Sequence, residues 1–147
     1  MSYEVIVVGT DGSERAAIAI TEALSLAKAT GAKLHVVHGV HPAVEAGYTE
    51  SKSGQLTIDK ARQGVEGFKA ALLAEAECQG VSAEVHNPGT SDPADALIEA
   101  AETFDADVVV VGNKGTSGVK RFLLGSVPNK LANHCPCSVL IVNTDAD

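Results

Sequence analysis

The chain has 147 residues, of which 45% are apolar and only 3% are aromatic, with no Trp. Its 19 acidic and 11 basic side chains give a net charge of −8, which argues against general binding of nucleic acids or anionic membranes. This length predicts a single domain, residues 1–147, and no apolar run approaches the roughly 20 residues of a membrane span.

The N-terminus and the cysteines predict a cytoplasmic location. The sequence begins MSYEVIVV, without the basic region and cleavage site of a secretory signal. Cys78, Cys135 and Cys137 are an odd number of cysteines, which indicates a reducing compartment. His134, Cys135 and Cys137 resemble half of a metal site, but no second Cys or His pair at suitable spacing completes it. We therefore expect a structural turn there.

Apolar runs alternate with helical patterns along the whole chain. The predicted strands are residues 4–8, 33–37, 81–85, 108–111 and 138–142. The predicted helices are residues 14–30, about 55–79, a segment opening at Asp92 and Pro93, and 126–134. This order requires right-handed crossovers and a mostly parallel sheet, so the fold class is α/β. Residues 108–111 are four valines, as expected of a strand buried between two helical layers, whereas residues 81–85 alternate like an edge strand.

Two connections matter for function. The segment from His38 to about Gln55 has no strong period and is either a lid or partly helical. The loop after the valine run contains Gly112, Gly115 and Gly118, and Ser126 is predicted to cap the helix that follows it. Between residues 108 and 144 there is no Asp or Glu, but there are four basic side chains: Lys114, Lys120, Arg121 and Lys130.

A basic, glycine-rich loop before a helix start predicts an anionic ligand, most simply a phosphate. The alternative is that the glycines only turn the chain. The loop matches neither the P-loop pattern nor the dinucleotide fingerprint. If the first and fourth strands are neighbours, residues 9–13 and 112–118 line the same crevice.

Asp11 directly follows the first strand. Its carboxylate can accept hydrogen bonds from ribose hydroxyls, hold a metal ion beside phosphates, or cap the loop by bonding the backbone N–H of Gly12 or Ser13. The five histidines show no shared spacing, and His38, His41 and Glu45 can share a metal only if that segment is helical. Since no nucleophile motif or acid–base pair stands out, the sequence supports binding better than catalysis.

These residues resemble a known family. Gly112-x-x-Gly115, nine residues, then Gly125-Ser126 is similar to the G-x₂-G-x₉-G-[ST] signature of nucleotide-binding universal stress proteins. The opening IVVGTDGSERA resembles the family's first strand and loop, so the resemblance spans the chain. It implies a Rossmann-like, five-stranded parallel sheet of order 3-2-1-4-5, with helices on both faces. It also implies an adenine nucleotide between strands one and four.

The resemblance also implies which residues hold the ligand. In chain order these are Gly9, Thr10 and Asp11 at adenine and ribose, Gly39 at the base, Val111 and Gly112 at base and ribose, Asn113 and Gly115 at the phosphates, and Gly125, Ser126 and Val127 holding those phosphates. Family members usually form homodimers, often by antiparallel pairing of the last strand, here residues 138–142.

The favoured hypothesis is a cytoplasmic regulatory protein of the stress response that senses an adenine nucleotide. ATP, with or without Mg²⁺, is expected as the ligand, and AMP or cyclic AMP is the alternative. A second hypothesis is a slow Mg²⁺-dependent ATPase or phosphotransferase that uses Asp11. A third is a dimeric interaction protein that binds no nucleotide.

Overall fold

The computed structural model describes residues 3–39, 58–88, 92–113 and 125–144. Strands and helices alternate through these residues, as predicted. The strands are β1 (Val5–Thr10), β2 (Lys33–His38), β3 (Ala83–His86), β4 (Val108–Gly112) and β5 (Ser138–Val142), and the helices are α1 (Glu14–Thr30), α3 (Ile58–Cys78), α4 (Pro93–Thr103) and α5 (Ser126–His134). The predicted third strand was two residues early at its start, because the chain leaves α3 through Gly80 and Val81 before it pairs.

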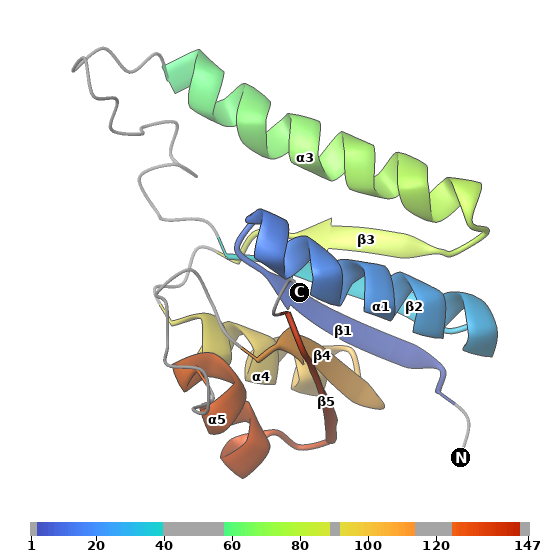
Figure 1. The fold of residues 1–147 in the computed structure, drawn as a ribbon, viewed down its shortest axis with the longest axis vertical. Coiled ribbons are helices and arrows are strands. Elements are labelled where there is room, and N and C mark those ends of the chain that lie inside the picture. Colours follow the sequence, from blue (N-terminus) through green and yellow to red (C-terminus); the bar gives the residue numbers. More distant parts are fainter. Residues whose placement is uncertain (1–2, 40–57, 89–91, 114–124, 145–147) are drawn as a thin grey trace.

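The strands form one parallel sheet of order β3-β2-β1-β4-β5 (Figure 1). This order confirms the α/β prediction and the strand order implied by the resemblance. β1 lies at the centre, where Ile6 pairs with Leu34 of β2 on one side and with Val108 of β4 on the other. β3 and β5 are the two edges, in agreement with the alternating pattern of β3.

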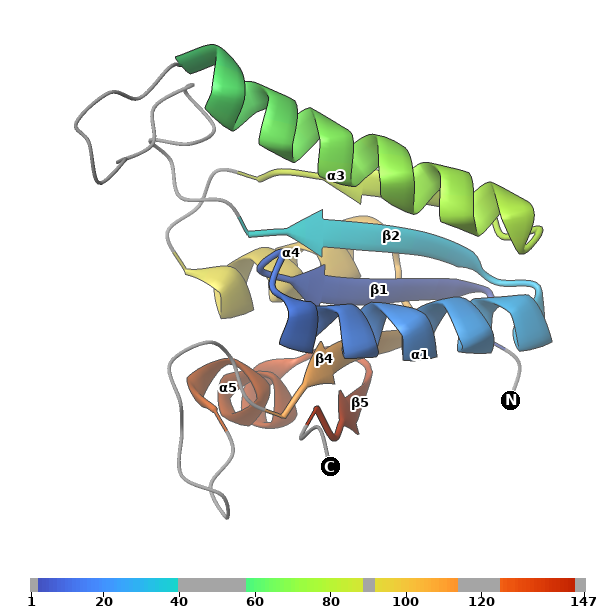
Figure 2. The same cartoon turned by 45° about the horizontal axis from the view of Figure 1, so that its top comes forward.

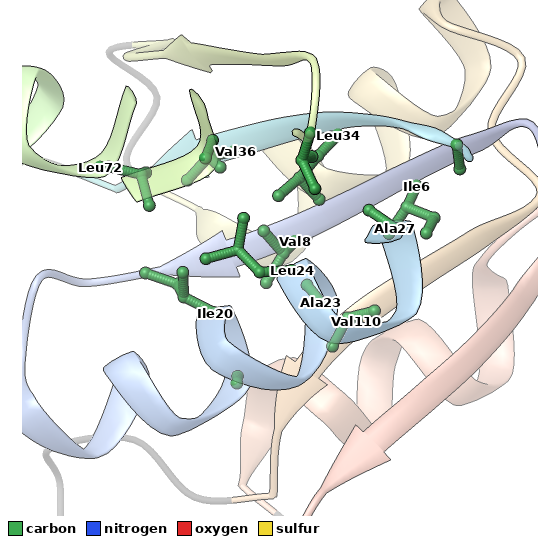
Figure 3. Close-up of a cluster of buried hydrophobic side chains, with 14 of the residues drawn as sticks. Ile6, Val8, Ile20, Ala23, Leu24, Ala27, Leu34, Val36, Leu72 and Val110 are labelled. Carbon is green, nitrogen blue, oxygen red and sulfur yellow. The ribbon is translucent and has the colours of Figure 1, made fainter. Parts of the chain in front are cut away.

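Helices cover both faces of the sheet (Figures 1 and 2), with α1 and α3 on one face and α4 and α5 on the other. Each face has its own core. Val108 and Val110 belong to the core under α1, and Val109 and Val111 to the core under α4 and α5. The valine run is therefore buried on both faces, as predicted. Figure 3 shows the α1 side, where Leu24 packs among side chains of the neighbouring strands.

The helix ends follow local chemistry. Ser13 caps α1, since its Oγ accepts a hydrogen bond from the backbone N–H of Ala16 at 3.1 Å. α1 ends at Gly31, whose φ of 75° is the left-handed conformation that glycine adopts at little cost. Asp92 caps α4 by accepting from Ala94 and Asp95. Among the described helices, none is both long and apolar enough to cross a membrane.

Asp107 closes the amino ends of the central strands. Its Oδ2 accepts hydrogen bonds from the backbone N–H groups of Glu4 at 2.8 Å and Val5 at 3.0 Å. Its own N–H donates to the carbonyl of Val5 at 2.9 Å. These backbone donors hold the pKa of Asp107 below its ordinary value of 3.8. The carboxylate therefore fixes the start of β4 against the start of β1.

This clamp makes a pH-dependent prediction. The pKa of Asp107 is lower in the folded state, so its contribution to stability is present above pH 3.8 and is lost as the pH falls through the folded pKa. We expect Asp107→Ala to lower the free energy of unfolding in urea at pH 7. The difference from wild type should shrink in acid, and Asp107→Asn, which keeps a neutral acceptor, should be less affected. A difference that stays constant down to pH 3 would contradict the clamp.

Candidate functional site

The carboxyl ends of β1 and β4 lie side by side. Ile6 to Val8 pair with Val108 to Val110, so the residues that follow each strand leave the same edge of the sheet. The strand order also reverses here, because the chain passes from β1 to β2 on one side and from β4 to β5 on the other (Figure 2). Such a switch point is where open α/β sheets bind ligands. The prediction that β1 and β4 are neighbours is therefore confirmed. Of the two segments predicted to line one crevice, residues 9–13 and 112–118, residues 114–118 lie outside the described residues, so the shared crevice stays a prediction.

The turn from β1 into α1 is held by its own side chains. The Oγ1 of Thr10 accepts from the N–H of Gly12 at 3.1 Å, and the Oδ1 of Asp11 accepts from the N–H of Ser13 at 2.9 Å. The loop-capping role considered for Asp11 is thus confirmed. It uses one carboxylate oxygen of an exposed side chain, so the second oxygen, Oδ2, can still face a ligand.

Two glycines, Gly9 near the end of β1 and Gly12 in the turn after it, have steric reasons for lacking a side chain. A Cβ on Gly9 would lie 2.7 Å from Cδ1 of Leu97, a buried residue of α4. Gly12 has a φ of 84°, and a Cβ there would lie 3.0 Å from Nε2 of His38. The backbone of β1 therefore approaches α4 closely, and the turn after it approaches the end of β2.

Backbone bonds also fix Gly39 and Asn113. Gly39, at the end of β2, donates to the carbonyl of Thr10 at 2.8 Å, so it lies beside the β1 turn. The N–H of Asn113 donates to Val142, and its carbonyl accepts from Gly125 at 2.9 Å. The latter bond joins the two ends of the glycine loop.

The side chain of Asn113 anchors the end of the last strand. Its Oδ1 accepts from both the N–H and the Oγ1 of Thr144, at 3.0 and 2.9 Å, and Thr144 is fully buried. The amide nitrogen, Nδ2, is therefore the group that Asn113 can offer to a ligand. The resemblance implied a contact with phosphates for this residue but gave no hint of this structural bond.

The start of α5 differs from the prediction. Ser126 was expected to cap the helix, but it is the first helical residue, and the cap is Gly125, with φ −63° and ψ 166°. Glycine takes this extended cap geometry readily, yet it offers no side-chain acceptor, and no side-chain hydrogen bond caps α5. Among the residues that the structure describes, no side chain accepts from the first N–H groups of the helix, at Ser126 and Val127. A helix start of this kind suits an anion.

One of the four basic residues is engaged elsewhere. The Nζ of Lys130 lies 2.9 Å from Oδ2 of Asp92 and 2.7 Å from Oδ1 of Asp95, which joins α5 to α4. The carboxylates of Asp95 and Asp92 raise the pKa of Lys130. The hydrogen bond from Lys130, and then one from the backbone N–H of Asp95, lower the pKa of Asp92. The charge of Lys130 is therefore balanced within the fold and does not add to an anion site. Lys114, Lys120 and Arg121, with Gly115 and Gly118, lie outside the described residues. So do residues 40–55 of the segment predicted from His38 to about Gln55, whereas His38 itself belongs to β2.

His38 is a residue at this edge that the sequence analysis did not place in the site. It is the last residue of β2, only 7% exposed, and its Nδ1 has no hydrogen-bond partner among the described residues. Its ring packs on Phe68, with centroids 4.5 Å apart. Burial lowers the pKa of His38, although the nearby Asp11 raises it, so the imidazole is neutral near pH 7. The signal in the sequence that could have placed His38 at this edge is its position directly before Gly39, a predicted site residue.

The cysteines before β5 are structural. The sulfur atoms of Cys135 and Cys137 are 3.7 Å apart, and both side chains pack against the core under α4 and α5. Burial, and then the adjacent Cys135, raise the pKa of Cys137 to about 12. Because a thiol that stays protonated is neither a good nucleophile nor a good metal ligand, the geometry agrees with the predicted structural turn.

Known proteins resemble this chain along its whole length. Residues 2–143 match the universal stress protein family. A putative universal stress protein of Staphylococcus saprophyticus is 32% identical over 150 residues, which cover 99% of this chain and 86% of the relative. A universal stress protein solved in complex with cAMP is 32% identical, with a TM-score of 0.73, and the match covers 99% of this chain and 100% of that one.

A more distant structure shares the fold. It is the universal stress protein of Archaeoglobus fulgidus in complex with dAMP, which is 24% identical with a TM-score of 0.63. The match covers 96% of this chain and 98% of that one.

The approach of β1 to α4 gives a packing prediction. Gly9→Ala should lower the free energy of unfolding by about 1–3 kcal/mol, because its Cβ would press on Leu97. In a double-mutant cycle with Leu97→Ala, the combined loss should be smaller than the sum of the single losses. Gly67→Ala, at a helical glycine with nothing within 4 Å, is the control and should not destabilise. Simple additivity of the two changes would show that the contact is unimportant.

Proposed function

Because the chain belongs to the universal stress protein family, we propose that it binds an adenine nucleotide at the carboxyl ends of β1 and β4. In this proposal the protein is a cytoplasmic regulatory module of the stress response. ATP is the first candidate ligand, and cyclic AMP or AMP is the alternative. The nucleotide is a signal that changes the protein's surface for its partners.

The observation that carries the proposal is the meeting of three segments at one edge of the sheet. The turn after β1, the end of β4 and the uncapped start of α5 are brought together by strand pairing and by the bond from Gly125 to Asn113. An exposed carboxylate, glycine backbone and free helix N–H groups suit a ribose, a base and phosphates respectively. The relative solved with cAMP, at 32% identity over nearly the whole chain, supports the same ligand class.

Each of the predicted site residues has a role in this proposal. Asp11 accepts from the ribose hydroxyls through Oδ2, while Oδ1 keeps the loop closed. Gly9, Thr10, Gly39, Val111 and Gly112 border the adenine and ribose, and Asn113, Gly115, Gly125, Ser126 and Val127 hold the phosphates. We add His38, whose buried Nδ1 offers a polar contact beside Gly39. Mg²⁺ accompanies the ligand only when that ligand is ATP.

We also propose that the protein is a homodimer joined through β5. β5 is an edge strand, and Leu140 on it is the exposed large apolar side chain among the described residues, at 40%. An unpaired strand edge with an apolar side chain is a template for antiparallel pairing with a second copy. Since Asn113 binds Thr144 just after β5, the strand that would meet the partner is connected to the proposed nucleotide edge.

Nucleotide binding is tested by calorimetric titration with ATP, ADP, AMP and cyclic AMP, with and without Mg²⁺, after removal of any ligand that co-purifies. We expect Asp11→Ala to weaken binding about 10-fold or more, because hydrogen bonds to a charged group are lost. Gly115→Val should abolish binding if the backbone of the loop approaches the phosphates.

The matched control is Glu22→Ala, which removes an exposed carboxylate on α1. It should bind like wild type, and thermal unfolding of each variant separates loss of binding from loss of folding. If no adenine nucleotide binds at millimolar concentration, the proposal is wrong and the family fold serves protein interaction alone. Phosphate release measured in the same samples distinguishes sensing from slow hydrolysis.

The dimer is tested by light scattering after gel filtration. Wild type should have about twice the chain mass of 15.0 kDa. Leu140→Lys places a charge on the exposed edge and should give a monomer of 15.0 kDa. Thr21→Lys, an exposed change on α1, should leave the dimer intact. A monomeric wild-type protein, or a Leu140→Lys variant that remains dimeric, would contradict pairing through β5.

A further inference from the structure

Two histidines and a glutamate meet where β3 pairs with β2. β3 is an edge strand of the sheet (Figure 1). His35 of β2 pairs in register with Glu84 of β3, and His86 follows Glu84 by two residues, so the three side chains share one face. His35 is only 5% exposed, whereas Glu84 is exposed and His86 is intermediate. This group cannot be recognised from spacing in the sequence, because 51 residues separate the two histidines.

The donor atoms already have the spacing of a metal site. Nδ1 of His35 lies 3.0 Å from Nε2 of His86 and 3.3 Å from Oε2 of Glu84, and the remaining pair is 3.9 Å apart. Ligands about 2.0–2.1 Å from a tetrahedral Zn²⁺ are about 3.3–3.4 Å from one another. The three observed distances bracket that value, so a cation can be accommodated with shifts of a few tenths of an ångström.

An aromatic side chain holds the imidazoles in place. Phe104, which follows α4, stacks on His35 with centroids 3.9 Å apart and an interplanar angle of 5°. It also stacks on His86, at 4.9 Å and 27°. Rings fixed by packing lose little freedom when they bind a metal, so the site is preorganised. Burial, and then the neighbouring His86, lower the pKa of His35, which agrees with a neutral imidazole ligand.

From this geometry we propose that His35, Glu84 and His86 form a binding site for a divalent transition-metal ion of the Zn²⁺ type. Two imidazoles and one carboxylate suit Zn²⁺, Co²⁺ or Ni²⁺, whereas Mg²⁺ and Ca²⁺ prefer oxygen ligands. The three protein ligands leave a fourth position for water or another donor. The metal would connect edge strand β3 to β2. The site does not depend on the nucleotide proposal, because His35 pairs with Val7, in the middle of β1 and away from its carboxyl end.

Binding has two competitors within the protein. One proton bridges Nδ1 of His35 and Nε2 of His86, and on metal binding it moves to the other nitrogen of its ring. The Nζ of Lys33 lies 3.3 Å from the same Oε2 of Glu84 that would bind the metal. Lys33 is 44% exposed and flexible, so it can leave, but its ammonium group opposes a second cation. Removing Lys33 should therefore strengthen metal binding.

The test is calorimetric titration of the whole protein, after chelation, with Zn²⁺, and with Mg²⁺ as the negative probe. We expect one Zn²⁺ per chain and a higher unfolding temperature when Zn²⁺ is in excess. His86→Ala and Glu84→Gln should weaken Zn²⁺ binding at least 10–100-fold. Lys33→Ala should strengthen it, and this opposite change would not arise from general destabilisation.

Co²⁺ spectra and a matched control separate this site from the thiols. Co²⁺ on nitrogen and oxygen ligands gives visible d–d bands without the intense near-ultraviolet band of thiolate ligands. His134→Ala removes an exposed histidine next to Cys135 and should leave Zn²⁺ affinity unchanged. Circular dichroism confirms folding of each variant. Wild-type affinity in both His86→Ala and Glu84→Gln, a thiolate band with Co²⁺, or no Zn²⁺ binding at millimolar concentration would overturn the proposal.

Discussion

The position of β1 between β2 and β4 is the constraint on which the rest of the structure depends. Its register aligns Gly9 with Val37 and brings Val8 beside Val110, so the carboxyl ends of the three central strands share one edge. The polar groups at that edge are therefore those of the residues at or directly after the ends of these strands, such as Asp11 after β1 and Asn113 after β4. A different neighbour for β1 would separate the β1 turn from the glycine loop, and no side-chain change could restore the site.

The two ends of the sheet have opposite characters. At the amino ends, Asp107 saturates the first backbone donors of β1 with a charged acceptor. At the carboxyl ends, Gly9 and Gly12 shape the passage from β1 to α1, and no side-chain hydrogen bond from a described residue caps α5. The amino end is thus held by hydrogen bonds within the fold, and the carboxyl end is the edge at which open α/β sheets commonly bind ligands.

Local signals allowed much of the fold to be predicted from the sequence. A valine run, a Ser cap and a Gly terminator each act within a few residues, so their effect is visible in the chain itself. The cap of α5 was misplaced by one residue, because Ser126 is the commoner capping type and Gly125 wins only through its backbone geometry. The ion-pair partners of Lys130 could not be predicted either, since Asp95 and Asp92 lie 35 and 38 residues earlier in the chain.

Features that depend on strand register could not be predicted from the sequence. The group of His35, Glu84 and His86 exists only once β2 and β3 are paired, and His38, at the end of β2, packs on Phe68 of α3. The resemblance to a family supplied the strand order and the site residues. It said nothing of these side chains, because the family signature lies in the glycines of the opposite half of the sheet.

The central strand has a consequence for how the chain is made. One of the two partners of β1, β4, is synthesised about 100 residues after it, and the Asp107 bonds span 102 and 103 residues. Closing so large a loop is entropically costly, and such non-local pairing slows folding. A growing chain therefore carries an apolar strand edge until β4 has left the ribosome, and during that interval it is open to chaperones and to aggregation.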